Sequence, residues 1–218
     1  ERMKHIEPQV RNLLKCDFVE QIVLSNHNPE VQLEDKVKLR DARLRFINQP
    51  VRRGCGYRWF VADTLDPDYL IVIDDDIWLF PGQLAKLFRQ LVNEPEMPHG
   101  LTGMRRLSNG ALEYRERDNL TVDYLCEIYA VTRHHLKRYI KLERSLAKDD
   151  AIARMVAAAH DFMVISQTGS HNPKIHNTGR LFRSPTFNQP GVAVHKEPGF
   201  DQSMTDVSRA LQQVLVSG

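Results

Sequence analysis

An apolar run that ends in three consecutive aspartates constrains this 218-residue chain more than any other feature. Residues 69–73 (YLIVI) are apolar throughout, which is typical of a short strand covered on both faces. Asp74, Asp75 and Asp76 follow directly. In an open α/β sheet, the carboxyl end of such a strand faces the crevice where ligands bind. We therefore expect the three carboxylates to lie at a ligand-binding face.

Three adjacent carboxylates repel one another, so a bound cation is their natural compensation. Oxygen ligands select hard divalent ions, and Mg²⁺ and Mn²⁺ are the ones that also bind phosphate oxygens. Alternation along the strand sends Asp74 and Asp76 to one side and Asp75 to the other. A solvated acidic turn that only caps the next helix is the alternative, since aspartate is favoured there.

Composition narrows the class of protein. The chain is 42% hydrophobic, which suits one compact domain, and its formal net charge of +2 gives no field that would favour nucleic acid. No apolar run approaches the roughly 20 residues that span a bilayer. The compartment stays open between the cytoplasm and the lumen of the secretory pathway. Three cysteines without a CxxC pair predict free thiols rather than a zinc site: Cys16, Cys55 and Cys126.

Apolar periodicity predicts helices and strands in alternation. Helices are expected over 2–14, 57–64, from 81 onward, 134–140, 148–159 and 201–216. Strands are expected over 18–24, 44–47, 69–73, 101–104, 124–132 and 162–166. This order predicts an α/β fold with a mostly parallel central sheet flanked by helices. We divide the chain into a main region, 1–166, and a tail, 167–218, with an irregular loop over 171–198.

Two other classes of phosphate enzyme fit the sequence less well. A Walker-type ATPase needs a GxxxxGK[ST] motif, and the chain has none. A phosphatase with an aspartyl nucleophile needs a small-residue turn after its aspartates, whereas Ile77 and Trp78 follow here. A nucleotidyl- or phosphoryl-transfer enzyme on the same acidic strand remains an alternative. So does an inactive module that binds nucleotide or carbohydrate.

Four segments in sequence order resemble those of GT-A nucleotide-sugar glycosyltransferases: 69–76, 100–105, 124–131 and 148–153. Within that superfamily the chain is most similar to the exostosin-type hexosaminyltransferase domain, whose members carry three aspartates and a later Asp-Asp helix start. The resemblance implies a single Rossmann-like GT-A domain. It would transfer sugar from a nucleoside-diphosphate sugar, a UDP-sugar by preference, to a hydroxyl of a glycan, protein or small molecule. The exostosin likeness favours retention of configuration.

The resemblance also implies roles for the acidic triplet and the tail. Asp76 matches the position that binds Mn²⁺ or Mg²⁺, and Asp74 matches one that holds the ribose or a metal-bound water. Asp75 would contact the ribose or brace the turn. One of three histidines in the late loop could complete the metal sphere: His171, which we take first, His176 or His195. The family's first strand has no counterpart, and the chain opens on what resembles the helix after it.

In the family, the stretch that matches residues 48–58 supplies base and phosphate contacts. The candidates here are Asn48, Arg52, Arg53 and Arg58, and the glycines between them permit close backbone approach. A solvated basic turn is the alternative. Arg180 and Arg183 in the tail could close over the diphosphate as a lid.

The resemblance places catalysis at a second acidic pair. Asp150 matches the acidic residue near the sugar-transfer centre, and Asp149 lies beside it. We expect one of the two to cap the helix and the other to face the substrate.

Overall fold

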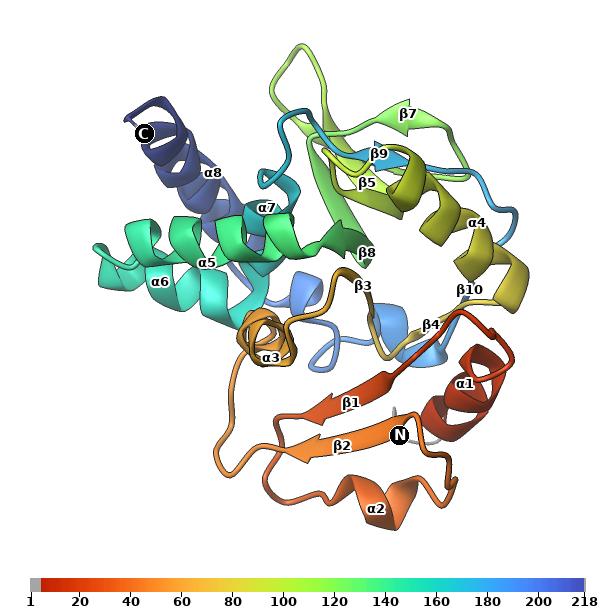
Figure 1. Cartoon of the computed structure of the whole chain (residues 1–218). Helices are drawn as coiled ribbons and strands as arrows, with labels where there is room; N and C mark the ends of the chain where they lie inside the picture. Colours follow the sequence, from red (N-terminus) through yellow and green to blue (C-terminus); the bar gives the residue numbers. More distant parts are fainter. Residues whose placement is uncertain (1–4, 218) are drawn as a thin grey trace.

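The computed structural model describes residues 5–217. Figure 1 shows a central sheet with helices on both faces and a two-stranded ribbon below it. The helices are α1 (Ile6–Leu13), α2 (Leu33–Lys36), α3 (Tyr57–Leu65), α4 (Pro81–Asn93), α5 (Arg133–Leu146), α6 (Asp150–Met155), α7 (Asp161–Ser166) and α8 (Phe200–Ser217). A π-helix, η2 (Val156–His160), joins α6 to α7, and the short 3-10 helices η3 (Pro185–Asn188) and η4 (Val194–Lys196) lie in the tail.

The strands are β1 (Ile22–Asn26), β2 (Leu44–Asn48), β3 (Tyr69–Ile73), β4 (Ile77–Trp78), β5 (His99–Arg106), β6 (Leu112–Glu116), β7 (Leu120–Thr121), β8 (Tyr124–Thr132), β9 (Lys174–Ile175) and β10 (Phe182–Arg183). The central sheet has the order β3-β8-β5-β9-β7, with β6 also paired to β5. β1 and β2 form a separate parallel pair, and β10 pairs with β4.

The prediction of a mostly parallel sheet was wrong. In the described part of the central sheet only β5 and β9 pair in parallel, while β3–β8, β5–β8, β5–β6 and β7–β9 are antiparallel. A short connection explains one of these antiparallel pairs, β5–β6, because a parallel crossover needs about a dozen residues. The turn 107–111 joins β5 to β6. It contains Asn109-Gly110, a dipeptide typical of β-hairpins, and Gly110 has a φ of 86°. The sequence alone could therefore have predicted this hairpin.

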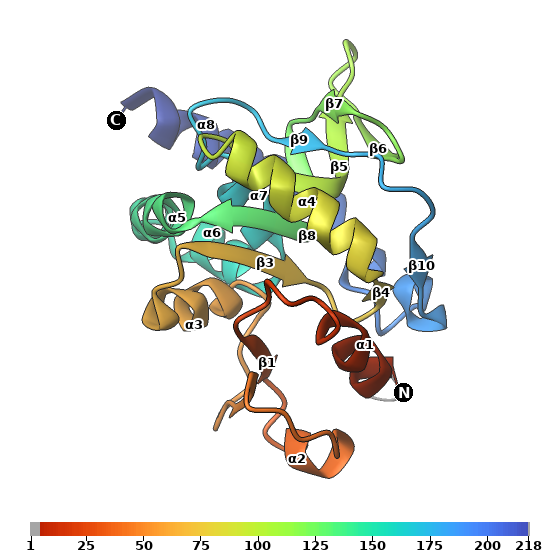
Figure 2. The same cartoon turned by 45° about the vertical axis from the view of Figure 1, so that its right-hand side comes forward.

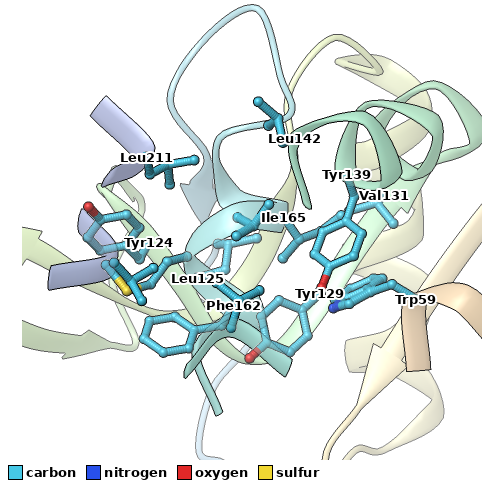
Figure 3. Close-up of a cluster of buried hydrophobic side chains, with 14 of the residues drawn as sticks. Trp59, Tyr124, Leu125, Tyr129, Val131, Tyr139, Leu142, Phe162, Ile165 and Leu211 are labelled. Carbon is cyan, nitrogen blue, oxygen red and sulfur yellow. The ribbon is translucent and has the colours of Figure 1, made fainter. Parts of the chain in front are cut away.

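The core fills both faces of the sheet. One cluster lies between β8 and α3, α5, α7 and α8, and Figure 3 shows its aromatic centre. There the Trp59 ring lies 5.6 Å from the Tyr129 ring and 5.5 Å from the Tyr139 ring, centroid to centroid. A second cluster packs α1 and α4 on the other face. Burial of each large apolar side chain contributes roughly 1.5–3 kcal/mol.

Residues 162–166 were predicted as a strand but belong to helix α7. All five are buried, and a run of four apolar residues before a serine is too short to reveal a helical period. The helix expected over 148–159 is present as α6 followed by η2. The other predicted helices and strands are present, although α5 extends six residues beyond its expected end and β1 begins four residues after its expected start. Residues 2–4 of the first predicted helix lie outside the described residues.

The tail is more regular than the predicted loop. β9 joins the central sheet, β10 pairs with β4, and α8 is confirmed as a terminal helix. α8 packs against α5, α6 and α7. Within residues 5–217, no helix combines the length and the apolar character needed to cross a bilayer.

Candidate functional site

An open cleft of about 2110 Å³ separates the β1–β2 ribbon from the central sheet. β1 forms one wall, and β3 with the acidic residues that follow it forms another. Parts of the tail between 187 and 195 border the cleft as well. Figure 2 shows the ribbon standing away from the main sheet. The acidic triplet, Asp74 to Asp76, lines this cleft, and its role in binding a ligand stays a prediction.

The acidic loop, residues 74–76, connects β3 to β4 and is held by its main chain from both sides. The Asp74 amide donates to the Glu127 carbonyl at 2.9 Å, and the Ser184 amide donates to the Asp76 carbonyl at 2.7 Å. All three carboxylate side chains are half-buried and line the cleft. The loop is therefore fixed at its ends while its carboxylates remain accessible to a ligand.

Arg58, in the first turn of α3, joins the acidic loop to a buried carboxylate that the sequence did not single out. Its Nη1 donates to Asp74 Oδ1 at 2.5 Å, and its Nε donates to Asp161 Oδ2 at 2.8 Å. Asp161 is 1% exposed and also accepts from Trp59 Nε1 at 2.6 Å. Arg58 thus lies in the cleft wall, as part of an ion network rather than as an unneutralised cation.

Burial raises the pKa of Asp74 to about 7. Arg58 opposes this shift, whereas the nearby Asp76 and Glu127 add to it. About a third of the Asp74 side chain, 32%, still faces the cleft. A cation that arrives there would stabilise the ionised form and lower the pKa again.

Gly54 and Gly56 serve a different contact from the one predicted. The Gly56 amide donates to the Ala157 carbonyl of η2 at 3.0 Å. A Cβ built on Gly54 would lie 2.0 Å from that same carbonyl oxygen, and one on Gly56 would lie 3.2 Å from Ala157 Cα. The glycines therefore let the chain pack against the π-helix, which places α3 beside α7 and Arg58 beside Asp161.

A β-bulge interrupts β8 at Glu127. Gly100 pairs with Tyr129 and Thr102 pairs with Cys126, so β8 carries one more residue than β5 between these pairs. Glu127 has a φ of 59°, in the region that side-chain-bearing residues rarely adopt. Its carboxylate lines the cleft at 7% exposure. Glu127 is the one charged residue in the run 124–132, and that was the signal in the sequence that could have identified it.

The Glu127 carboxylate is fully engaged. It accepts from Arg183 Nε at 2.7 Å and Nη2 at 2.9 Å, and from the Tyr114 hydroxyl at 2.6 Å. Arg183 also pairs with Glu116 at 2.8 Å. The predicted lid role assigned Arg183 to a diphosphate, but these two carboxylates already neutralise it.

The remaining predicted donor contacts are scattered. Asn48 accepts from the Leu33 amide at 3.0 Å and donates to Glu34 at 2.8 Å, and it does not line the cleft in the described part of the chain. Arg52 is exposed and lines the cleft, whereas Arg53 is exposed but does not.

The late histidines are also separated. His171 is exposed and lies outside the cleft lining. His176 is buried, with its Nε2 2.8 Å from Nδ1 of His99. His195 does line the cleft, and its Nε2 lies 3.0 Å from Asn188 Oδ1. Of the three, only His195 lines the same cleft as the acidic triplet in the described part of the chain.

Asp149 and Asp150 lie at the start of α6. Asp149 caps the helix, since its Oδ1 accepts from the Ala151 amide at 2.8 Å and the Ile152 amide at 3.2 Å. Asp150 is exposed, and neither residue is among those that line the described cleft. One of the pair is thus the expected cap, and a role for Asp150 in transfer stays a prediction.

A divalent ion would find oxygen ligands here but no complete cage. Among residues 5–217, no group of three or more His, Cys, Asp or Glu side chains is arranged to hold a metal. Mg²⁺-type ions are often held by one or two carboxylates, with water and substrate phosphates completing the sphere. The triplet fits that chemistry, in which the metal arrives together with a phosphate ligand.

Comparison with known proteins relates the structure to a known fold. No family model matches the sequence, and no curated protein matches it either. Among solved structures, the crystal structure of GalNAc-T7 with UDP, GalNAc and Mn²⁺ matches with a TM-score of 0.60 at 11% sequence identity. The chain resembles a GT-A glycosyltransferase in fold. The match covers 93% of this chain and 45% of that one. At this identity the likeness to the GT-A enzyme extends to the fold alone.

Proposed function

We propose that this chain is a metal-dependent glycosyltransferase domain that moves a sugar from a UDP-sugar to an acceptor hydroxyl. One observation carries the proposal: the acidic triplet follows β3 and lines the open cleft of a GT-A-like fold. The similar enzyme GalNAc-T7 was crystallised with UDP, GalNAc and Mn²⁺. The acceptor would be a glycan, a protein or a small molecule.

Asp76 would hold Mn²⁺ or Mg²⁺ together with the donor phosphates, and Asp75 would contact the ribose or brace the turn. When bound, such an ion neutralises the diphosphate as it leaves. Asp74 would contribute through the ribose or a metal-bound water, because Arg58 already occupies one of its oxygens. Arg52, exposed on the cleft, would supply a charge-assisted contact to phosphate. Arg53 and Asn48 stay weaker candidates for the same donor.

The chemical step is assigned from the exostosin-type resemblance. The exostosin-type resemblance favours retention, and it assigns Asp150 the task of orienting the sugar or acceptor. Asp150 would have to reach the transfer centre from outside the cleft lining, so its assignment rests on the resemblance. Asp149 is occupied as a helix cap.

Titration calorimetry with UDP, with and without Mn²⁺, tests the donor site. We expect metal-dependent binding in the parent and its loss in Asp76→Asn, with the fold intact because this carboxylate is not in the core. Asp17→Asn, at an exposed site outside the cleft, is the matched control and should bind as the parent does. UDP affinity that ignores Mn²⁺ in the parent would contradict the proposal.

A screen of nucleotide sugars with Mn²⁺ then separates the functions. Release and transfer of sugar supports the transferase. Binding without turnover on any donor favours the inactive module, and cleavage between the phosphates favours nucleotidyl or phosphoryl transfer. In the same screen, Asp150→Asn should lower transfer by about 10²-fold if it acts as a positioned acid–base group. Transfer near the parental rate would make Asp150 structural.

A further inference from the structure

The acidic loop is tied to the tail through a small, half-buried ion network. Arg183 follows directly on Phe182 in β10, the strand that pairs with β4 immediately after the loop. Its guanidinium reaches across to Glu127 at 2.7 and 2.9 Å. Arg183 is 16% exposed and Glu127 8% by side chain, so the pair is shielded from water. We name Glu127, Arg183 and Tyr114 the clasp.

The two ends of the clasp are also the two anchors of the acidic loop. The Glu127 carbonyl receives the Asp74 amide, and the residue after Arg183, Ser184, donates its amide to the Asp76 carbonyl. The ion pair therefore joins the segment that holds the start of the loop to the segment that holds its end. A change in the pair would move both anchors relative to each other.

The backbone at Glu127 indicates that this arrangement is specific. A bulge with φ of 59° turns the side chain out of the regular strand alternation and into the cleft. Its amide donates to a side chain, the Tyr129 hydroxyl, at 3.1 Å. Bulges commonly re-aim one side chain beside an active site, and a strained backbone persists only where the surroundings enforce it.

We propose that Glu127 is a positioning residue: through Arg183 it fixes the conformation of the acidic loop and so sets the affinity of that loop for a metal–diphosphate. The metal–diphosphate part rests on the proposed function, whereas the control of loop conformation does not. Glu127 itself makes no contact with the donor in this scheme, because Arg183 and Tyr114 occupy its carboxylate.

Two variants break the clasp without removing any residue of the acidic loop. Glu127→Gln keeps the shape and removes the charge, and Arg183→Met removes the guanidinium. Arg183→Lys is the conservative variant, since it keeps the charge but loses the two-pronged geometry. Arg180→Met is the matched control, because Arg180 is an exposed arginine of the same segment whose guanidinium lies 4.9 Å from the Phe182 ring.

Amide hydrogen exchange measures the loop directly and needs no ligand. We expect exchange over residues 74–77 and 182–184 to accelerate by about tenfold or more in Glu127→Gln and Arg183→Met, as local opening becomes easier. Arg183→Lys should lie between these variants and the parent, and Arg180→Met should match the parent. Parental exchange in a folded Glu127→Gln and Arg183→Met would overturn the proposal.

Calorimetry with UDP and Mn²⁺ tests the second half. The broken clasp should weaken UDP binding at limiting Mn²⁺ by about tenfold, and raising the Mn²⁺ concentration should restore it. A variant that is destabilised but still folded, with its acidic loop in place, would bind UDP as the parent does at every Mn²⁺ concentration. Weaker binding with parental exchange would overturn the clasp and assign Glu127 a direct donor contact. If the parent binds no UDP, the proposed function fails, and the exchange experiment still decides the clasp.

Discussion

At the scale of single residues, charged side chains that no sequence motif identified hold the wall of the cleft in place. Asp161 opens α7, is 1% exposed and accepts from both Arg58 and Trp59. Its other oxygen, Oδ1, has no hydrogen-bond partner in the described structure. A carboxylate buried to this extent is tolerated only while a cation compensates it. Arg58 supplies that cation and at the same time holds Asp74 in the acidic loop.

Replacing Arg58 should therefore affect the stability of the fold first and ligand binding second. Arg58→Met leaves the buried Asp161 carboxylate without its cation, and we expect the free energy of unfolding to fall by roughly 3 kcal/mol. Urea denaturation measures this change. Arg53→Met, at an exposed arginine, is the control and should shift stability by less than about 0.5 kcal/mol.

The double variant Arg58→Met/Asp161→Asn separates charge burial from lost packing. It should recover part of the loss, since the buried group no longer carries a charge. A single variant as stable as the parent would show that the network contributes nothing to folding.

At the scale of elements, the π-helix η2 sets where α3 and α7 meet. Its Ala157 carbonyl accepts from the Gly56 amide, and the space beside Gly54 is taken by the same carbonyl. π-bulges are rare in helices and often occur beside functional sites. Here the bulge ends one residue before Asp161, so it places that carboxylate under Arg58.

A methyl group at Gly54 should disturb this junction. Gly54→Ala would place a Cβ 2.0 Å from the Ala157 oxygen, a contact that only a backbone shift can relieve. Overpacking of this kind costs about 1–3 kcal/mol, and thermal unfolding should show it as a lower Tm. Gly82→Ala, in α4 with no atom within 4 Å of the new Cβ, is the matched control and should be neutral or slightly stabilising. Equal Tm values for the two variants would contradict the packing role of Gly54.

At the scale of the whole molecule, several histidines are folded into the interior in the neutral form. Burial lowers the pKa of His135 and of His176 to about 4. Two more buried histidines have lowered pKa values for the same reason: His99 and His160. These groups couple the stability of the fold to pH.

The direction of this pH dependence follows from whether the folded or the unfolded chain binds more protons. Unfolded histidine has a pKa near 6.5, so between about pH 6.5 and 4 the unfolded chain takes up protons that the folded chain refuses. The contribution of these histidines to stability is therefore fully present above pH 6.5 and is lost as the pH falls towards 4. Asp74 acts the other way, because its raised pKa lets the folded state hold a proton up to about pH 7. Burial raises the pKa of Glu143 in the same direction. Four histidines oppose these two carboxyls, so the net effect is loss of stability in acid.

Urea denaturation between pH 7 and 4.5 checks this prediction. His176→Gln should flatten the dependence by up to about 1.4 kcal/mol per pH unit, the contribution of one proton. His171→Gln, at an exposed position, should leave the slope of the parent unchanged. A parent whose stability is constant over this range would refute the assignment.

The sequence by itself determined most elements and the place of the acidic triplet. Hydrophobic period and helix or strand termini act within a few residues, so 69–73, 81–93 and 124–132 could be assigned from local pattern. The strand run before Asp74 also predicted a ligand-facing acidic loop. The glycines of residues 54–56 were recognised as sites of close approach, although their partner was not.

Tertiary structure alone decided the sheet direction, the identity of α7 and the groups that hold the acidic loop. Strand pairing joins residues far apart in sequence, and an alternation of helices and strands is compatible with either direction unless connection lengths are weighed. Asp161, Glu127 and Arg183 lie 87, 53 and 109 positions from Asp74 (161 − 74, 127 − 74 and 183 − 74). Each of these charged groups acts through a partner within about 3 Å. Asp161 accepts from Arg58, and Glu127 accepts from Arg183. No local pattern encodes those distances, and only the folded chain brings these groups together.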